Sequence, residues 1–257
     1  MTTPIFIPSK SRADSARLLI REDLPDSVTV VVEPQDEALY RAHYPTYKFL
    51  ILPENNKGIT FVRNFIKQYT ENNSIHHYWQ LDDDVTGFYT RQLQKMIKFP
   101  LQEALAHAET QFRHNNISLG ALGYQQIEWS ATKDMAVNGY ADVCVWVDNT
   151  KTFGMRYDAY VEGKEDRDFA LQVIAAGKRT GRSTLYTFSA PKNGSNDGGL
   201  KEIFYDQSGR EAECSRRMIE KWPGVCTANV KEDGRPDVKI NWKAVGQPNV
   251  NSIFGAI

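Results

Sequence analysis

The stretch that decides the fold is His77-Tyr78-Trp79-Gln80-Leu81-Asp82-Asp83-Asp84, a short strand-like run that ends in three carboxylates. Adjacent carboxylates repel one another, so a strand end that gathers three of them indicates a cation there. Side chains alternate along extended backbone, so Asp82 and Asp84 point the same way and can share one Mg²⁺ or Mn²⁺ with a diphosphate, while Asp83 turns aside. The alternative interpretation is a solvated acidic loop.

Further short apolar runs flank this strand and alternate with helical patterns. Strands are predicted at 5–7, 27–33, 49–52, 119–127 and 141–148. Helices are predicted at 15–21, 60–69, 100–115, 169–176 and 210–221. Continuous apolar strands between helices indicate an α/β fold, in which a mostly parallel, Rossmann-like sheet is covered by helices on both faces.

Length and composition predict one globular domain. The chain has 257 residues, of which 41% are hydrophobic, and no apolar run approaches the roughly 20 residues that cross a bilayer. No membrane partner is expected, and a start without an export signal favours the cytoplasm. Cys144, Cys214 and Cys226 lack metal-site spacing and are expected to be free thiols. The Gly- and Asn-rich segment 192–199 is expected to be a mobile loop, followed by a helix and a polar tail.

Polar residues also gather at other predicted strand ends, where open parallel sheets bind ligands. Pro8-Ser9-Lys10-Ser11-Arg12 follows the first strand and either meets a phosphate or nucleobase or only caps a turn. Glu33 ends the second strand, where it can accept hydrogen bonds from a ribose or base edge. Glu165-Asp166 precedes a helix. These acids either take a proton from an attacking hydroxyl or merely favour the helix dipole.

The order of these motifs resembles that of the GT-A glycosyltransferases. Gly58-Ile59-Thr60-Phe61-Val62-Arg63-Asn64 comes before the Asp-x-Asp, and Glu165-Asp166 comes after it. The narrower resemblance, over nearly the whole chain, is to the TET-associated glycosyltransferases of bacteriophages, and it is carried by 7–12, 32–34, 56–58 and the segment from Trp222 to Trp242. That family implies a GT-A fold. It also implies inverting, metal-dependent transfer from a UDP-sugar to the hydroxyl of 5-hydroxymethylcytosine, or a related hydroxymethylpyrimidine, in phage DNA.

The resemblance implies a role for each matching residue. The uridine would lie among Pro8, Ser9, Arg12 and Glu33, and the rest of the nucleotide-sugar beside Gly58, Arg63, Asn64, Asp82 and Asp83. Asp82 and Asp84 would hold the metal, and Asp166 would be the general base, with Asp168 as its rival. Arg63 suits a diphosphate contact and a clamp on a carboxylate equally well. All five histidines lie before residue 115, so a C-terminal histidine ligand seen in many relatives is missing, and diphosphate and water would complete the metal shell.

The implied domain organisation has two parts. Residues 1–190 would form the core that binds the nucleotide-sugar and the acceptor, and residues 191–257 would form a loop, a helix and a tail packed on the same domain. The oligomeric state is left open.

A DNA acceptor has only local support in the sequence. A net charge of -1 excludes a global positive field. The run 178–182 and the cluster Arg216, Arg217 and Lys221 can meet phosphates or be solvated helix ends. A tryptophan can stack on an extruded base or fill the core; the candidates are Trp129, Trp146, Trp222 and Trp242. Two alternatives use the same aspartates: a GT-A transferase acting on a saccharide, lipid or protein hydroxyl, and a metal-dependent nucleotidyltransferase.

Overall fold

The computed structural model describes residues 3–191 and 209–245. The segment 192–199, for which the sequence predicts a mobile loop, lies outside the described residues. The elements are, in chain order, β1 (Ile5–Pro8), β2 (Val28–Val32), α1 (Glu37–His43), β3 (Lys48–Ile51), α2 (Ile59–Asn72), β4 (His77–Leu81), β5 (Gly87–Gln92), β6 (Lys95–Lys98), α3 (Leu101–His114), β7 (Leu119–Tyr124), α4 (Gln125–Glu128), β8 (Met135–Val137), β9 (Cys144–Asp148), α5 (Asn149–Thr152), the 3₁₀ turn η1 (Ala159–Val161), α6 (Glu165–Ala175), β10 (Thr180–Ser189), α7 (Arg210–Lys221), β11 (Cys226–Val230) and β12 (Pro236–Ile240).

The described part contains one large sheet with the order β3-β2-β1-β4-β9-β7-β10-β5-β6, and β8 pairs with β10. Seven of its ten strands run in one direction, because only β9, β5 and β8 are antiparallel to the strands beside them that share β1's direction. The predicted mostly parallel α/β sheet is thereby confirmed. The antiparallel insertion of β9 brings its amino end beside the carboxyl end of β4, with Leu81 opposite Cys144.

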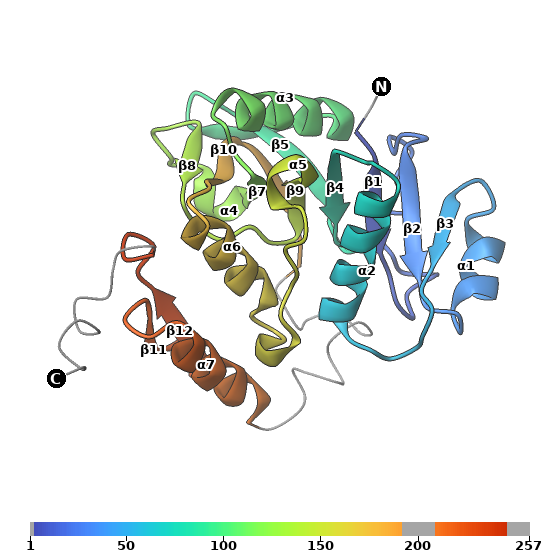
Figure 1. Cartoon of the computed structure of the whole chain (residues 1–257). Helices are drawn as coiled ribbons and strands as arrows, with labels where there is room; N and C mark the ends of the chain where they lie inside the picture. The colour runs from blue at the N-terminus through green and yellow to red at the C-terminus, as the bar shows by residue number, and fades with distance from the viewer. Residues whose placement is uncertain (1–2, 192–208, 246–257) are drawn as a thin grey trace, which may run out of the picture.

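Alternating side chains of the strands fill two cores, one on each face of the sheet. On one face, Trp79 and Leu81 of β4 pack with α3 residues such as Leu105 and Phe112. On the other, Tyr78 packs with residues of α2 and α6. Figure 1 shows α2 and α6 in front of the strands and α3 running across the top. Helices therefore cover both faces, and the strand ends at the edges of the sheet are left to form sites.

The predicted helix at 15–21 is wrong, because this segment forms successive turns. The amide of Leu18 donates to the carbonyl of Asp83 at 2.9 Å and is thereby diverted from a helical bond. This bond ties the segment to the end of β4. Helix α6 begins at Glu165, four residues before the predicted start.

The predicted polar tail is an ordered antiparallel pair, β11 and β12, that follows α7. Met218 of α7 and Val238 of β12 share a small core with Val161 and Leu171. This packing places the C-terminal elements beside η1 and α6, as Figure 1 also shows. Within the described ranges, no helix has both the length and the apolar character needed to cross a membrane.

Candidate active site

Asp83, the middle residue of the acidic run, ties the ends of β1 and β4 together. Its Oδ1 accepts a hydrogen bond from the Arg12 guanidinium at 2.7 Å, and its Oδ2 accepts one from the Ser9 hydroxyl. The oxygen of the Ser9 hydroxyl lies 2.6 Å from that of the Tyr40 hydroxyl. Both Ser9 and Asp83 are buried. Ser9 and Arg12, expected at the uridine, and Asp83, expected beside the rest of the nucleotide-sugar, therefore form one network that shapes this strand end.

Asp82 interacts electrostatically with a different cation, Arg63 of α2, and with several carboxylates. Burial raises the pKa of Asp82 to about 8; Arg63 opposes the rise, while Asp84, Asp83 and Asp142 add to it. The raised pKa means that the ionised carboxylate is under-compensated by the protein's own charges. A divalent cation at this position would restore the balance.

Asp142, just before β9, belongs to the same group of carboxylates although it stands in none of the sequence motifs. The backbone amide of Asp82 donates to the carbonyl of Val143 at 3.0 Å, which joins the two strand ends. Burial and the nearby Asp166 raise the pKa of Asp142 to about 6, against the effects of Tyr124, Arg167 and Arg63. The Tyr124 hydroxyl donates to Asp142 Oδ2 at 3.1 Å. The only sequence signal was an aspartate at the start of a predicted strand, whose direction the sequence does not reveal.

The start of α6 brings Glu165 and Asp166 to the same place. Arg63, itself only 6% exposed, donates to Glu165 Oε1 at 2.8 Å, and Glu165 Oε2 accepts a bond from the Gly163 amide. Asp82 and Asp166 also act electrostatically on Arg63. Of the two roles open to Arg63, the structure therefore provides the carboxylate clamp, with Glu165 as the clamped residue. Asp166 is partly exposed and free of that clamp.

Asp168, the rival for the general base, is fully buried away from solvent. Its carboxylate accepts hydrogen bonds from the Trp222 indole at 2.8 Å, the Lys221 ammonium at 2.9 Å and the Gln172 amide at 2.7 Å. These contacts join α6 to the end of α7. Asp168 is therefore a structural anchor rather than a cap of α6, whose N-cap is Lys164 with no side-chain cap bond.

Glu33 and Pro8 lie at the ends of β2 and β1, beside the Asp83 network. The Glu33 carboxylate accepts hydrogen bonds from the Lys10 ammonium at 3.1 Å, the Gln35 amide at 2.7 Å and the Asn56 backbone amide at 2.9 Å. Glu33 thus braces the loop before α2 in this structure. A nucleoside bound at this edge would have to share the Glu33 carboxylate with these donors.

Gly58 and Asn64 shape the first turns of α2. Gly58 has φ +82°, a left-handed conformation, and a Cβ there would lie 1.9 Å from a Glu162 oxygen. The amide of Asn64 donates to the Tyr157 carbonyl and its oxygen accepts from the Tyr157 amide, both at 2.8 Å. Asn64 therefore holds the segment before α6 against α2, and so aligns Arg63 with Glu165.

The donor groups at this edge fit a hard cation that arrives with a phosphate ligand. Among the described residues, no three Asp, Glu, His or Cys side chains gather closely enough to hold a metal by themselves. Mg²⁺ commonly uses only one or two protein carboxylates, together with water and substrate phosphates. Asp82 and Asp84 fit that pattern, and the raised pKa of Asp82 is consistent with a charge that awaits a cation.

The structure shows the ion pairing of one basic segment considered for DNA contacts and the position of the other. Arg216 and Arg217 pair with Glu213, and Lys221 pairs with Asp158 and Asp168, so this cluster is neutralised within the protein. The run 178–182 leads into β10, whose first residue pairs with the first residue of the parallel β7. It therefore lies at the amino end of the sheet, opposite the carboxylates.

The tryptophans separate into core and surface residues. Trp146 is fully buried, while Trp129 is 54% exposed. Trp222 is bound to Asp168. Trp242 is partly exposed, and its ring centroid lies 6.0 Å from that of Tyr140, two residues before Asp142. Of these four tryptophans, Trp242 is therefore the one that packs beside the segment carrying Asp142.

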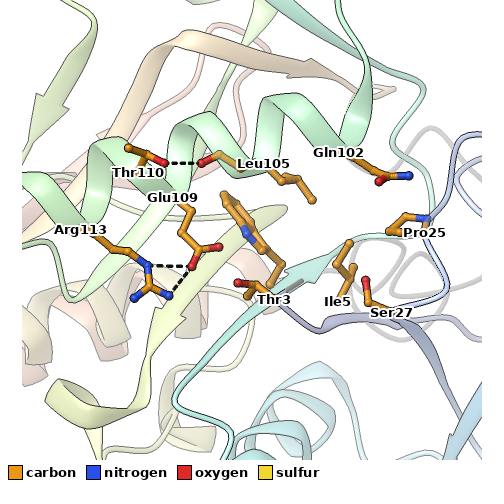
Figure 2. A pocket seen from close by; sticks show the side chains of 11 residues that line it. Thr3, Ile5, Pro25, Ser27, Gln102, Leu105, Glu109, Thr110 and Arg113 are labelled. Carbon is orange, nitrogen blue, oxygen red and sulfur yellow. Dashed lines mark hydrogen bonds and ion pairs between the residues drawn. The ribbon is translucent and has the colours of Figure 1, made fainter. Parts of the chain in front are cut away.

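A cavity of about 320 Å³ lies beneath α3, beside the amino ends of β1 and β2 and the middle of β4 (Figure 2). Figure 2 shows the Glu109–Arg113 ion pair on its wall. The Trp79 indole nitrogen and the Ser27 hydroxyl, on residues that line it, have no hydrogen-bond partner within the described part of the chain. None of the carboxylates at the carboxyl end of β4 lines the cavity, so the cavity is no part of the candidate active site.

Comparison with known proteins identifies a family for this chain. Residues 3–199 match the family model described as TET-Associated Glycosyltransferase. Comparison with curated protein sequences gives no match. Among solved structures, S. aureus TarS 1-349 aligns at 12% identity and TM-score 0.49 over 85% of this chain and 66% of that one. This chain therefore spans slightly less than two thirds of that protein's length. A protein of Desulfovibrio desulfuricans G20 described as a putative nucleotide-diphospho-sugar transferase aligns at 11% identity and TM-score 0.42 over 70% of this chain and 79% of that one.

The family match shows that the chain is a glycosyltransferase, and its mostly parallel α/β sheet is the GT-A type of fold expected for such an enzyme. Since the family model covers more than half of its residues, the chain belongs to the TET-associated glycosyltransferase family.

Proposed function

We propose that this enzyme transfers a sugar from a UDP-sugar to the hydroxyl of 5-hydroxymethylcytosine, or a related hydroxymethylpyrimidine, in DNA, with Mn²⁺ or Mg²⁺ as cofactor. The observation that carries the chemistry is the convergence of Asp82, Asp142 and Asp166 on Arg63 at one end of the sheet. Membership of the TET-associated family supports the acceptor.

Different residues of the chain act on the leaving diphosphate and on the acceptor hydroxyl. A cation on Asp82 and Asp84 would neutralise charge on the leaving diphosphate. Asp166, partly exposed at the start of α6, takes the proton of the acceptor hydroxyl as its oxygen bonds to the anomeric carbon and the bond to UDP breaks. Direct displacement of this kind inverts the anomeric configuration. Arg63 and Glu165 keep α2 and α6 in register, so that the two sides face each other.

A planar acceptor is supported by the aromatic pair Tyr140 and Trp242. Both rings are partly exposed, and Arg167, the neighbour of Asp166, lies 5.5 Å from the Tyr140 ring centroid. Aromatic rings and guanidinium planes are the surfaces on which extruded bases stack. A saccharide acceptor is the second candidate, and the neutralised cluster on α7 favours it, since DNA binding needs unpaired cations.

The deciding experiment incubates the protein with Mn²⁺, a panel of UDP-sugars, and DNA that contains either 5-hydroxymethylcytosine or unmodified cytosine. We expect UDP release with the hydroxymethylated DNA alone, and a nucleoside heavier by one sugar residue in its digest. UDP release that depends on an added saccharide but not on DNA would replace the DNA acceptor with a saccharide. A lack of UDP release with every acceptor and sugar would contradict the proposal.

A further inference from the structure

Asp142 has an acceptor oxygen that the protein leaves unused. Its Oδ2 accepts from the Tyr124 hydroxyl, but its Oδ1 is buried and has no hydrogen-bond partner within the described residues. A buried acceptor without a partner costs free energy comparable to the desolvation of the group, so such atoms usually await a ligand or water. The residue as a whole is partly exposed while Oδ1 itself is covered, so a bound molecule would approach this oxygen from beside the exposed part of the residue.

The backbone holds this carboxylate in place at a further cost. Val143, the next residue, has φ 59°, a left-handed conformation that β-branched residues rarely adopt. The bond from the Asp82 amide to the Val143 carbonyl and the β4–β9 ladder maintain it. Backbone strain of this kind persists where the surrounding structure enforces a functional orientation. Together with Tyr124, it fixes the direction of the Asp142 carboxylate.

The nearby cations do not use the free oxygen. The guanidinium of Arg63 donates to Glu165, and that of Arg167 donates to Asp237. A metal shared by three protein ligands is not available either, since no such group exists in the part of the chain that the structure describes. The group that best fits a lone carboxylate oxygen here is therefore a neutral donor, such as a hydroxyl.

The position of Asp142 identifies that hydroxyl. Asp142 interacts electrostatically with Asp82, on the proposed diphosphate side, and with Asp166, the proposed base. The Tyr124 hydroxyl is close enough to all three carboxylates for each of them to raise its pKa. In a direct displacement, the ring of the transferred sugar lies between the leaving diphosphate and the base. We propose, building on the proposed function, that Asp142 binds a ring hydroxyl of the transferred sugar and so determines which sugars the enzyme accepts.

Calorimetric titration with Mn²⁺ present tests this proposal without an acceptor. The probes are UDP, UDP-glucose, UDP-galactose and the monodeoxy analogues of both sugars. We expect the wild type to bind one sugar about 10- to 100-fold more tightly than the analogue that lacks one particular hydroxyl, as suits a hydrogen bond to a charged group. In Asp142→Ala that ratio falls to about one, while the affinity for UDP is unchanged.

Two further variants keep the test decisive. Tyr124→Phe, which frees the carboxylate without removing it, should lower the same ratio only partly, and Asp148→Ala, at the far end of β9, should leave it unchanged. The inference would be overturned if Asp142→Ala kept the affinity ratio of the wild type, or if it lost affinity for UDP and UDP-sugar equally. It would also be overturned if the wild type bound every monodeoxy analogue as tightly as the parent sugar nucleotide. If the wild type binds neither UDP nor any UDP-sugar, the proposed function itself fails, and the inference fails with it.

Discussion

The carboxylates at the two ends of the β4–β9 ladder have pKa values shifted in opposite directions. At one end His77 lies opposite Asp148, and the His77 ring nitrogen is 3.5 Å from that carboxylate. Burial would raise the pKa of Asp148, but hydrogen bonds from His77, Thr150 and Lys151 outweigh it and lower the pKa. At the other end Asp82 and Asp142 come together, and both of their pKa values are raised.

The difference separates structural charges from functional ones. A carboxylate whose pKa is lowered contributes stability, whereas one whose pKa is raised reduces the stability of the ionised protein. The same pair of strands shows that this fold can supply partners for buried carboxylates. The carboxyl end lacks that compensation, as expected if it serves the proposed cation and substrate.

The largest expected effect is the loss of turnover in Asp82→Ala or Asp84→Ala. We expect activity to fall below detection, because the cation would lose a ligand, while the melting temperature without metal stays equal or rises. The matched control is Asp148→Ala at the opposite end, which should lower the melting temperature and keep turnover. Near-normal turnover of either first variant in Mn²⁺ buffer would show that its carboxylate is not a metal ligand.

The next effect concerns the base. Asp166→Asn should lower the rate of transfer by roughly 10²- to 10⁴-fold, the usual cost of losing a general base. Its affinity for UDP-sugar should stay within about twofold, since Asp166 lies on the acceptor side. Single-turnover rates and calorimetry separate these two quantities. Normal transfer by this variant, or a product with retained anomeric configuration, would remove Asp166 from the mechanism.

Asp168→Asn should change stability rather than chemistry. The substitution removes the buried charge that accepts from Lys221 and Trp222, and since Lys221 keeps Asp158 as a partner, we expect a loss of about 1.5–3 kcal/mol, the usual cost of a lost hydrogen bond to a charged group. Urea unfolding followed by tryptophan fluorescence measures this loss. Transfer at a temperature where the variant is folded should be within a few-fold of wild type. A folded variant with no transfer would shift the role of base to Asp168.

A smaller effect is expected in the dependence of stability on pH. The folded pKa of Asp82, about 8, is above its unfolded value, so its contribution to stability is complete below pH 4 and is lost as pH rises toward 8. With a chelator present, the free energy of unfolding should fall by about 1–2 kcal/mol between pH 6 and 8, after allowance for partial exposure. Asp82→Asn should abolish most of this fall. An equal fall in the variant would assign it to other groups.

Much of the fold was predictable because its strands are short apolar runs. The strand from His77 to Leu81 and the helix from Arg210 to Lys221 have the predicted bounds. Strand β10 escaped prediction, since its sequence Thr180–Ser189 mixes polar and apolar residues that sheet neighbours bury on both sides. The turns at 15–21 depend on the bond to the Asp83 carbonyl, which no local pattern reveals.

The candidate site was predictable only where its residues form motifs. Asp82, Asp84 and Asp166 stand in recognisable runs, and their proximity follows from strand order. Asp142 enters the site solely because β9 runs antiparallel beside β4, and strand direction is a tertiary property. The hydrogen-bond partners of Asn64 and Glu33 could not be predicted either, because they come from loops that are distant in the sequence.

Electron paramagnetic resonance of Mn²⁺ can show whether the carboxyl end of β4 is a metal and nucleotide site. Titration of the wild type with Mn²⁺ should show weak binding alone and binding at least 10-fold tighter with UDP, since diphosphate completes the coordination shell. Asp82→Asn and Asp84→Asn should abolish the UDP-dependent signal change, and Asp148→Asn should preserve it. Equal UDP-dependent Mn²⁺ binding in all three variants would contradict the account.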